Sequence, residues 1–295
     1  MSQLEDMQLF VSVLEQGSFT AAAEVLGLSK QFVSRRVAAL EARLGVRLLN
    51  RSTRKLSATA LGQSYFERAR RILQDVAETD MLVSEQGASP RGALRLAAPM
   101  SFGTLHLSEL LPTFMQRYPE VNIELDLSDR TVDLLGEGYD MAIRIGELAD
   151  SSLIARQLAP LHMVTCASPA YLAKHGEPQT PDDLRVHECM LYGHSKSVEW
   201  HYWRDGRSQR IALHGRYRVN NGELVRDAAI AGLGLTMLPT FIVGDALASG
   251  QLVTVLEAYQ MPAGKVYAVY PQHRQSSLLV QFLIDYLREA LTSQG

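Results

Sequence analysis

Apolar residues in the N-terminal part of the chain recur at the spacing of amphipathic helices. A first helix is predicted from Ser2, which opens a capping-box pattern with Glu5, and it ends at Gly17. Ser18 is a good N-cap for a short second helix, and Ser29 is a good N-cap for a third. On the third helix, four apolar residues share one face and are expected to be buried: Val33, Val37, Leu40 and Leu44.

The remaining face of the third helix carries polar and basic side chains, from Lys30 and Gln31 to Ser34 and Arg35. Two short helices joined by a tight, glycine-containing turn, with such a face on the second, are typical of a helix-turn-helix. A helix fits the major groove of DNA, where Gln31 would read a base edge and Ser34 or Arg35 would bond phosphate or base. The alternative is the solvated face of an ordinary three-helix bundle.

The segment VRLLNRSTRKLSATALG predicts a short strand, a basic turn and a returning strand, with Thr59 as the N-cap of the following helix. Three cations gather in this hairpin: Arg51, Arg54 and Lys55. A basic hairpin directly after a recognition-type helix predicts a winged helix-turn-helix, whose wing contacts the phosphate backbone. The alternative is a hairpin tip that is basic only because it is exposed.

Residues 60–85 carry apolar positions mostly three or four residues apart, with charges between them, so they predict one long helix. A helix of this length has little of its own domain to cover it, and pairing with a second copy would bury its apolar face. The alternative is that it packs back on its own chain. The sequence GASPRG, residues 87–92, then breaks the helix and predicts a hinge.

After the hinge the pattern changes to alternating strands and helices. ALRLAAP, VNIELDL and DMAIRIG predict strands with helical stretches between them. Such a succession indicates a parallel sheet flanked by helices, and therefore an α/β fold. A second region of the same kind begins at MVTCASPAYL and ends at GLGLTMLP, after which the strand KVYAVYP and the final helix are expected to return to the first sheet.

The net charge of −3 is unevenly spread, because residues 1–72 carry 11 Lys and Arg against 6 Asp and Glu, and the remainder carries 18 against 26. A basic N-terminal region, called the head below, on an otherwise acidic chain suggests that only this region binds an anionic partner. Cys166 and Cys189 show no disulfide or metal-ligand pattern, so neither a metal nor a cofactor is expected. The chain has no apolar run of about 20 residues and no signal-peptide core at its start, so the cytoplasm is the expected location.

Nearly the whole chain is covered by the stretches FVSVLEQGSFTAAAEVLGLSKQFVSRRVAALEARLGVRLLNRSTRKLSATALGQSYF, SPRGALRLAAPMSFG, YDMAIRIG, CASPAYL and GLGLTMLP. In sequence and order they closely resemble the LysR-type transcriptional regulators. The resemblance implies an N-terminal winged helix-turn-helix, a linker helix and a two-subdomain α/β effector domain like the type II periplasmic binding proteins. The implied boundaries are 1–59 for the DNA-binding domain, 60–86 for the linker and dimerisation helix, 87–92 for the hinge, and 93–295 for the effector domain, with subdomain I over 93–162 and 266–295 and subdomain II over 163–265.

The resemblance also implies DNA-contacting residues. Ser34 and Arg35 match the Ser-Arg pair of the family's recognition helix, and Arg51 matches a wing-side arginine. Many members carry Gln-Pro or a similar pair after the serine that matches Ser29, whereas Lys30 follows here, which concerns base preference and not DNA binding. The expected DNA-binding set is Ser29, Lys30, Gln31, Ser34, Arg35, Arg51, Arg54 and Lys55.

The implied effector cleft lies between the two α/β subdomains, on the side where open α/β sheets bind ligands. Ser101 and Phe102 follow its first strand, and Arg144 ends its third. The expected effector-binding set is Ser101, Phe102, Ser128, Arg144, Gly146, Asn221 and Gly222. Several of these residues also have a structural interpretation, as a helix cap for Ser101, a turn residue for Asn221 and an ion-pair partner for Arg144.

An enzyme is the main alternative class, but the scattered histidines belong to no HExxH motif, and neither GxSxG nor CxxC is present. A solute-binding transport protein would need export and would leave the basic head unexplained, while a stand-alone interaction protein would leave the cleft unused. We therefore expect a non-enzymatic regulator whose operator binding or DNA bending responds to a small organic effector. Its expected partners are double-stranded DNA, the effector, further copies of itself in a dimer or tetramer, and RNA polymerase, with no membrane.

Overall fold

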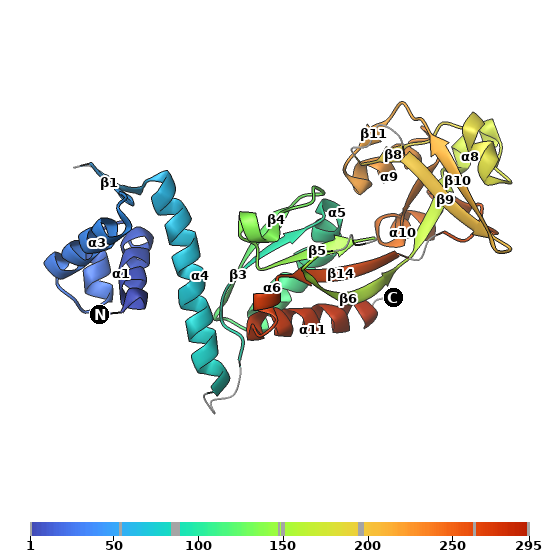
Figure 1. The fold of residues 1–295 in the computed structure, drawn as a ribbon. Helices are drawn as coiled ribbons and strands as arrows, with labels where there is room; N and C mark the ends of the chain where they lie inside the picture. Colours follow the sequence, from blue (N-terminus) through green and yellow to red (C-terminus); the bar gives the residue numbers. More distant parts are fainter. Residues whose placement is uncertain are drawn as a thin grey trace. The chain divides into compact units, whose positions relative to one another are not determined.

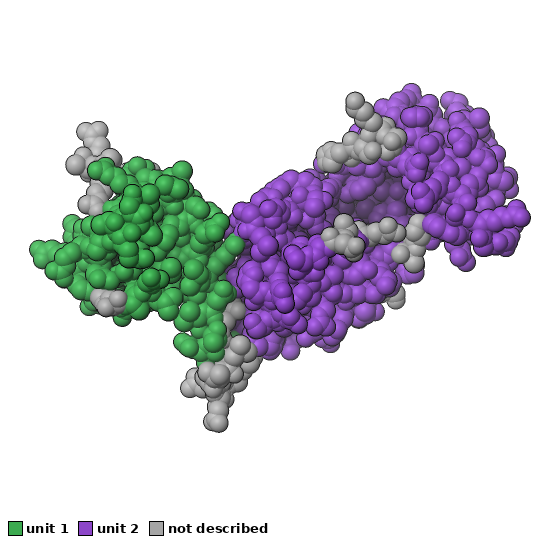
Figure 2. All heavy atoms as spheres, in the orientation of Figure 1, with its two compact units in different colours: residues 1–89 green, residues 90–295 purple. Residues whose placement is uncertain are grey.

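The computed structural model describes residues 2–52, 55–83, 89–146, 148, 151–193, 198–261 and 264–293. Contacts within the chain divide it into two compact units, Met1–Ser89 and Pro90–Gly295, called unit 1 and unit 2 below (Figure 2). Residues 84–88 lie outside the described part, and they include the predicted end of the linker helix at 86 and the first two hinge residues, so these two boundaries stay predictions. Among the helices that are described, none has the length and apolar character needed to cross a membrane.

Unit 1 consists of three helices, a hairpin and a long helix (Figure 1): α1 Gln3–Glu15, α2 Phe19–Val25, α3 Lys30–Leu44, β1 Leu49–Ser52, β2 Lys55–Ala58 and α4 Ala60–Val83. The predicted caps are present, since the hydroxyls of Ser2, Ser18 and Ser29 each accept a backbone N–H three residues later. Gly27 joins α2 to α3 at a φ of 65°, in the left-handed region that glycine adopts without strain. The predicted helix-turn-helix is therefore confirmed.

The apolar face of α3 forms the centre of unit 1. Val33, Val37 and Leu40 are at most 1% exposed and pack in one core with residues of α1, α2 and β1. Leu44, which was expected on the same face, is 36% exposed. It is the last residue of α3, next to the left-handed Gly45 cap, where the helix ends beyond the core.

The predicted basic hairpin is formed by β1 and β2, which pair antiparallel on either side of residues 53 and 54. Glu41 on α3 anchors it, because its carboxylate accepts the backbone N–H groups of Leu48 and Leu49 at 2.8 and 3.1 Å. Thr59 begins α4 with the predicted cap, since its hydroxyl accepts a backbone N–H at 2.9 Å. The hairpin is thus fixed directly to the recognition-type helix.

Gly62 shows how closely α4 passes the chain that enters β1. A Cβ atom at this position would lie 1.9 Å from the carbonyl oxygen of Leu48. We expect Gly62→Ala to push these backbones apart and to lower the free energy of unfolding by about 1–3 kcal/mol. Chemical denaturation would measure this, with Gly244→Ala as the control because a Cβ there meets nothing within 4 Å. A Gly62→Ala protein as stable as the wild type would contradict the close approach.

Helix α4 is covered by its own unit only over its first part. Tyr65 lies edge-on to Phe10 of α1 with ring centroids 5.4 Å apart, and Ala69 is 1% exposed. Farther along, Ile72 and Val76 are 40% and 37% exposed. The beginning of the long helix therefore packs back on its own chain, while Ile72 and Val76 remain uncovered by unit 1.

Unit 2 begins with a five-stranded sheet in the order β4-β3-β5-β14-β6. Its strands are β3 Gly92–Ala98, β4 Val121–Leu127, β5 Met141–Ile145, β6 Ile154–Leu161 and β14 Gly264–Tyr270. The accompanying helical segments are α5 Met100–Phe102, η1 Gly103–Leu107, α6 Ser108–Arg117, α7 Leu134–Glu137, η3 Gln272–Arg274 and α11 Leu278–Ser293. Side chains of α6 and α11 share one buried core with the sheet.

This sheet is mixed, whereas the alternation of strands and helices predicted a parallel one. Strand β3 pairs parallel with β4 and β5, but β14 pairs antiparallel with β5 and β6. The route of the chain explains the difference, because β6 leads out toward the second half of the unit and β14 leads back. The predicted return of KVYAVYP and the last helix to the first sheet is confirmed by β14 and α11.

The second half of unit 2 is also less parallel than predicted. Its three-stranded sheet is antiparallel in the order β12-β7-β13, and β9 and β10 form an antiparallel hairpin, so among the strand pairs that the structure describes here only the short β8–β11 pair is parallel. The strands are β7 Met163–Ala167, β8 Leu191–Tyr192, β9 Val198–Arg204, β10 Arg207–Leu213, β11 Arg218–Val219, β12 Thr236–Pro239 and β13 Val253–Val255. The helices are α8 Pro169–His175, η2 Pro181–Val186, α9 Gly222–Ile230 and α10 Thr240–Ala248.

Candidate DNA-binding surface and effector cleft

The free face of α3 consists of the residues predicted to contact DNA. Lys30, Gln31 and Arg35 are exposed and Ser34 is half-buried. Gln31 and Arg35 are four residues apart, so they lie on the same side of the helix. The guanidinium of Arg35 is 5.7 Å from the centroid of the Phe32 ring, a cation–π contact that helps to orient it. Helix α3 thus presents amide, hydroxyl and cationic groups of the kinds that bond base edges and phosphates.

The neighbouring Arg36 has a different role. Its guanidinium pairs with the carboxylate of Asp6 on α1, and the two side chains are 25% and 11% exposed. This ion pair links α3 to α1, so Arg36 stabilises the packing of the helices in unit 1. Arg35, in contrast, is exposed on the surface of α3. The sequence alone does not separate two adjacent arginines, because the partner of Arg36 lies 30 positions earlier in the chain.

The other predicted DNA contacts are described only in part. The hydroxyl of Ser29 is used as the cap of α3, where it accepts the N–H of Phe32 at 3.2 Å. Arg51 and Lys55 lie in β1 and β2, but their side chains, and Arg54 as a whole, are outside the described part of the chain. Their contacts with phosphate therefore stay predictions.

Unit 2 contains a cavity of about 300 Å³ between its two halves, which we call the cleft cavity. Four of the predicted effector residues line it: Ser101, Phe102, Ser128 and Arg144. Further polar lining, which the sequence analysis missed, comes from Asp129, Thr131 and Tyr192. The apolar lining includes Phe102, Ile145, Leu148, Phe241 and Ile242. The cavity therefore combines an apolar wall with a few polar groups, as small-molecule sites do.

Hydrogen bonds cross between the two halves of unit 2 at the cleft cavity. The hydroxyl of Ser101 donates to the carboxylate of Glu223 and accepts the backbone N–H of Gly222 at 3.0 Å. Tyr192 donates its hydroxyl to Asp129 at 2.9 Å. Burial, followed by the negative charge of Asp129, raises the pKa of Tyr192, so this hydroxyl keeps the proton that it donates. Ser101 thus joins the halves, and it does not cap its own helix, whose N-cap position is Pro99.

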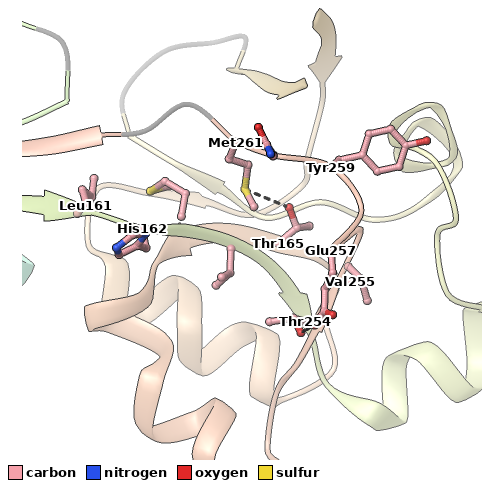
Figure 3. Close-up of a pocket in the computed structure, with 11 residues that line it drawn as sticks. Leu161, His162, Thr165, Thr254, Val255, Glu257, Tyr259 and Met261 are labelled. Atoms are coloured by element: carbon pink, nitrogen blue, oxygen red, sulfur yellow. Dashed lines mark hydrogen bonds between the residues drawn. The ribbon is translucent and has the colours of Figure 1, made fainter. Parts of the chain in front are cut away.

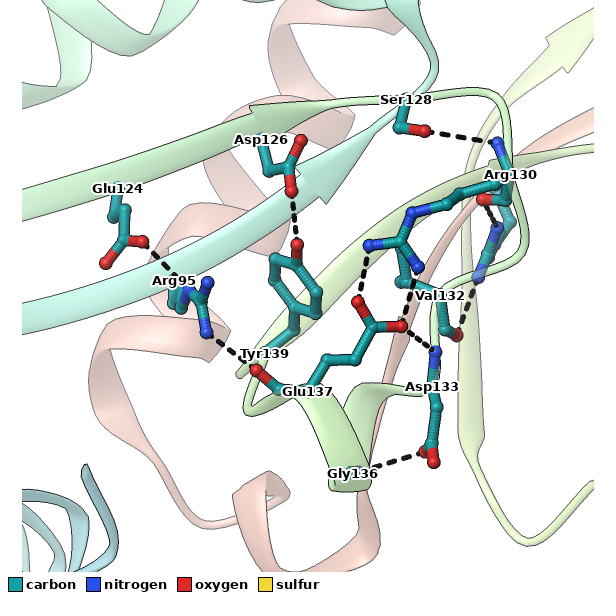
Figure 4. Close-up of polar contacts among 11 residues, drawn as sticks. Arg95, Glu124, Asp126, Ser128, Arg130, Val132, Asp133, Gly136, Glu137 and Tyr139 are labelled. Carbon is teal, nitrogen blue, oxygen red and sulfur yellow. Dashed lines mark hydrogen bonds and ion pairs between the residues drawn. The ribbon is translucent and has the colours of Figure 1, made fainter. Parts of the chain in front are cut away.

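Arg144 is positioned by backbone carbonyl groups. Its guanidinium donates to the carbonyl oxygens of Arg130 and Val132 at 3.2 and 3.1 Å. Arg130, in contrast, is paired with Glu137 through both carboxylate oxygens (Figure 4). The hydrogen bonds from Arg130 lower the pKa of Glu137 to about 2, so this carboxylate stays ionised and cancels the charge of Arg130. Among the described residues, Arg144 therefore differs from its neighbour in having no such counter-ion.

Three predicted effector residues do not line the cleft cavity. Gly146 follows β5 with a φ of 98°, a turn conformation that favours glycine. Asn221 has the structural role weighed from the sequence, since its side chain caps α9 by accepting the N–H of Leu224 at 2.9 Å. Gly222 is packed against α10, where an added Cβ would lie 2.4 Å from the Cδ1 atom of Ile242. Asn221 and Gly222 support the cleft wall from behind.

A second cavity, of about 380 Å³, lies where the chain crosses from β6 into β7 (Figure 3). Its lining includes His162, Thr165, Glu257 and Met261, and the hydroxyl of Thr165 contacts the sulfur of Met261 at 3.8 Å. The hydroxyls of Thr165 and Tyr202 are 2.8 Å apart behind this wall. None of the predicted effector residues reaches this cavity.

The described residues of unit 2 give little support to nucleophilic catalysis by a thiol or to metal binding. Burial raises the pKa of both Cys166 and Cys189 to about 12, so neither thiol forms the thiolate that a nucleophile or a metal ligand requires. Within the described residues, no group of three or more His, Cys, Asp or Glu side chains is arranged to hold a metal ion. These findings agree with the two thiols being small buried groups.

Two protein-family models match the chain. The bacterial regulatory helix-turn-helix of the LysR family matches residues 4–63, and the LysR substrate-binding domain matches residues 87–292. The first match spans the helix-turn-helix and its hairpin, and the second spans the part of unit 2 that contains the cleft cavity.

Relatives with curated names are regulators of the same kind. An uncharacterised HTH-type transcriptional regulator of Haemophilus influenzae is 38% identical over 95% of this chain and 98% of that protein. CrgA of Neisseria meningitidis serogroup C is 37% identical over 97% and 96%. The solved structure of a Neisseria meningitidis CrgA has a TM-score of 0.63 at 36% identity and 99% coverage of both chains, and that of the Vibrio cholerae virulence activator AphB has 0.60 at 29% identity, with 97% and 98% covered. The chain belongs to the LysR family of transcriptional regulators, with a DNA-binding head and an effector-binding domain.

Proposed function

We propose that α3 enters the major groove of an operator and that Lys30, Gln31, Ser34 and Arg35 contact it. The observation that carries this proposal is that two adjacent arginines differ, since Arg36 forms an ion pair with α1 while the side chain of Arg35 is exposed. Base readout comes from Gln31, whose amide can accept from adenine N6 and donate to N7, and from Arg35, whose guanidinium can donate to guanine O6 and N7. The wing cations, Arg51, Arg54 and Lys55, add phosphate contacts that depend on salt.

Two copies of the chain pair through the uncovered part of α4. Ile72 and Val76 leave an apolar stripe there, and a second α4 helix is the natural cover for it. A dimer holds two recognition helices at a fixed separation, which a palindromic operator requires. A tetramer built from two such dimers would bind two operator sites and contact RNA polymerase at the promoter, in the cytoplasm where the DNA is.

The effector binds in the cleft cavity, where Ser101, Phe102, Ser128 and Arg144 meet. Ser101 and Tyr192 bond across the cavity, so a ligand that rearranges these bonds changes the angle between the two halves. A ligand shifts such an equilibrium only by its different affinity for the two arrangements, typically worth about 1–3 kcal/mol. The resulting movement would alter the spacing of two DNA-binding heads, and therefore operator affinity or DNA bending.

The test fills the cleft cavity from an exposed lining position with Thr131→Trp. Operator affinity without effector should stay within about twofold of the wild type, because unit 1 is unchanged. A compound found by its effect on the melting temperature of the wild type should shift wild-type operator affinity by about 5- to 150-fold and that of the variant not at all. Lys174→Trp, on the exposed face of α8, is the control for added bulk. A normal response in the Thr131→Trp protein would place the effector site elsewhere.

A further inference from the structure

We propose that the effector is a small zwitterion, an α-amino acid or a close analogue, with its carboxylate on Arg144, its ammonium group on Asp129 and an apolar side chain. This inference rests on the proposed function, in which the cleft cavity holds the effector. It goes further because it assigns the charges of the ligand.

Arg144 is a cation that has no counter-ion in the part of the chain that the structure describes. Both of its hydrogen bonds are to neutral carbonyl oxygens, and no carboxylate of the described residues pairs with it. A guanidinium has five N–H donors, so up to three remain for a ligand. Burial lowers the pKa of Arg144, which shows that its positive charge is poorly solvated. A ligand carboxylate would supply the missing partner in the bidentate geometry that Arg favours.

Asp129 is the matching anion on the same cavity wall. Its two carboxylate oxygens accept the backbone N–H of Met100 at 3.0 Å and the hydroxyl of Tyr192 at 2.9 Å. Both partners are neutral, so the negative charge is not cancelled, and a carboxylate has about four acceptor positions in all. Glu223 lies nearby and adds a second negative charge that acts on Tyr192. An ammonium group is therefore favoured at this end of the cavity.

The two charges line one cavity but form no ion pair with each other within the described residues. A simple acid would satisfy Arg144 and bring a second negative charge beside Asp129, and a simple amine would leave Arg144 without a partner. A zwitterion satisfies both groups. Phe102, Ile145 and Phe241 supply apolar surface for its side chain, and a cavity of about 300 Å³ limits the ligand to a small molecule.

The experiment compares three probes that share one apolar body: L-phenylalanine, 3-phenylpropanoate, which lacks the ammonium group, and 2-phenylethylamine, which lacks the carboxylate. L-leucine, 4-methylpentanoate and 3-methylbutylamine form a second series of smaller size. Binding to the full chain is measured by calorimetric titration. We expect the amino acid of at least one series to bind about 10- to 100-fold more tightly than the corresponding acid and amine.

Two variants assign the charges. Arg144→Met should abolish the preference for the amino acid over the amine, and Asp129→Asn, which retains the hydrogen-bonding shape, should abolish the preference over the acid. Arg144→Lys keeps the charge and guards against a folding defect, and it should retain part of the preference. Arg130→Met is the matched control, because Glu137 already cancels that charge, and it should bind all probes as the wild type does.

Tighter binding of the acid, unaffected by Asp129→Asn, would overturn the proposal in favour of a simple anion. Tighter binding of the amine, unaffected by Arg144→Met, would overturn it in favour of a cation. If no amino acid binds but another compound shifts operator affinity through the cleft cavity, the zwitterion proposal fails and the proposed function stands. If the zwitterion binds in the predicted way without changing operator affinity, the proposed function fails instead.

Discussion

Arg35→Ala should weaken operator binding by about 5- to 150-fold, because a bidentate contact from an arginine to a base is worth about 1–3 kcal/mol. Arg35 is exposed on α3, and its guanidinium lies 5.7 Å from the centroid of the Phe32 ring. If the partner of Arg35 is a phosphate, the loss of affinity is the same for all DNA sequences. The slope of log affinity against log salt concentration then becomes shallower by about one. Titrations of mapped operator DNA at several salt concentrations distinguish these two outcomes.

Lys174→Ala is the control for loss of one positive charge, since Lys174 is exposed on α8 in unit 2. It should leave operator affinity unchanged. Arg36→Ala is the informative neighbour, because it leaves Asp6 without its partner and should lower the melting temperature of the protein. Equal operator affinity for folded Arg35→Ala and wild-type protein would remove Arg35 from the interface.

Ile72→Glu combined with Val76→Glu should dissociate the oligomer and lower operator affinity together. These residues are 40% and 37% exposed on the part of α4 that unit 1 leaves uncovered. In a paired helix the glutamates would place charge in an apolar seam, at a cost of several kcal/mol. A separated protomer binds only one half-site, so it loses the additional operator affinity that two linked DNA-binding domains provide.

Sedimentation velocity and operator titration on the same samples measure both effects. Val186→Glu is the control, since Val186 is 88% exposed in unit 2 and should tolerate the charge. An intact oligomer in the double variant would show that α4 is not the pairing surface, whatever its operator affinity.

Local signals in the sequence predicted the DNA-binding head well. Ser18 and Ser29 cap their helices through N–H groups only three residues away, and the apolar face of α3 follows from the spacing of residues within one helix. Both features can therefore be predicted from a short stretch of sequence. Asp205-Gly206 is a local signal of the same kind for the β9–β10 hairpin, and the sequence analysis overlooked it. Both residues have positive φ values, 51° and 73°, as the tight turn requires.

The cleft depends on contacts between residues that are far apart in the sequence. Ser101 bonds to Glu223 across 122 positions, and Tyr192 bonds to Asp129 across 63. The antiparallel direction of β14 likewise follows from the chain leaving and re-entering the first sheet, which the spacing of its apolar residues does not show. The resemblance implied the crevice, and the strand ends pointed to Ser101 and Arg144, which line the cleft cavity, but Asp129 and Tyr192 were missed.

We expect this chain to regulate transcription by placing α3 on specific DNA. Genome-wide mapping of bound DNA in cells that express either the wild type or Arg35→Ala tests it most directly, with equal protein levels confirmed. We expect discrete sites near promoters for the wild type, each containing two half-sites in palindromic arrangement, and loss of those sites for Arg35→Ala. The same sites at the same occupancy in both strains, or no discrete sites for the wild type, would contradict it.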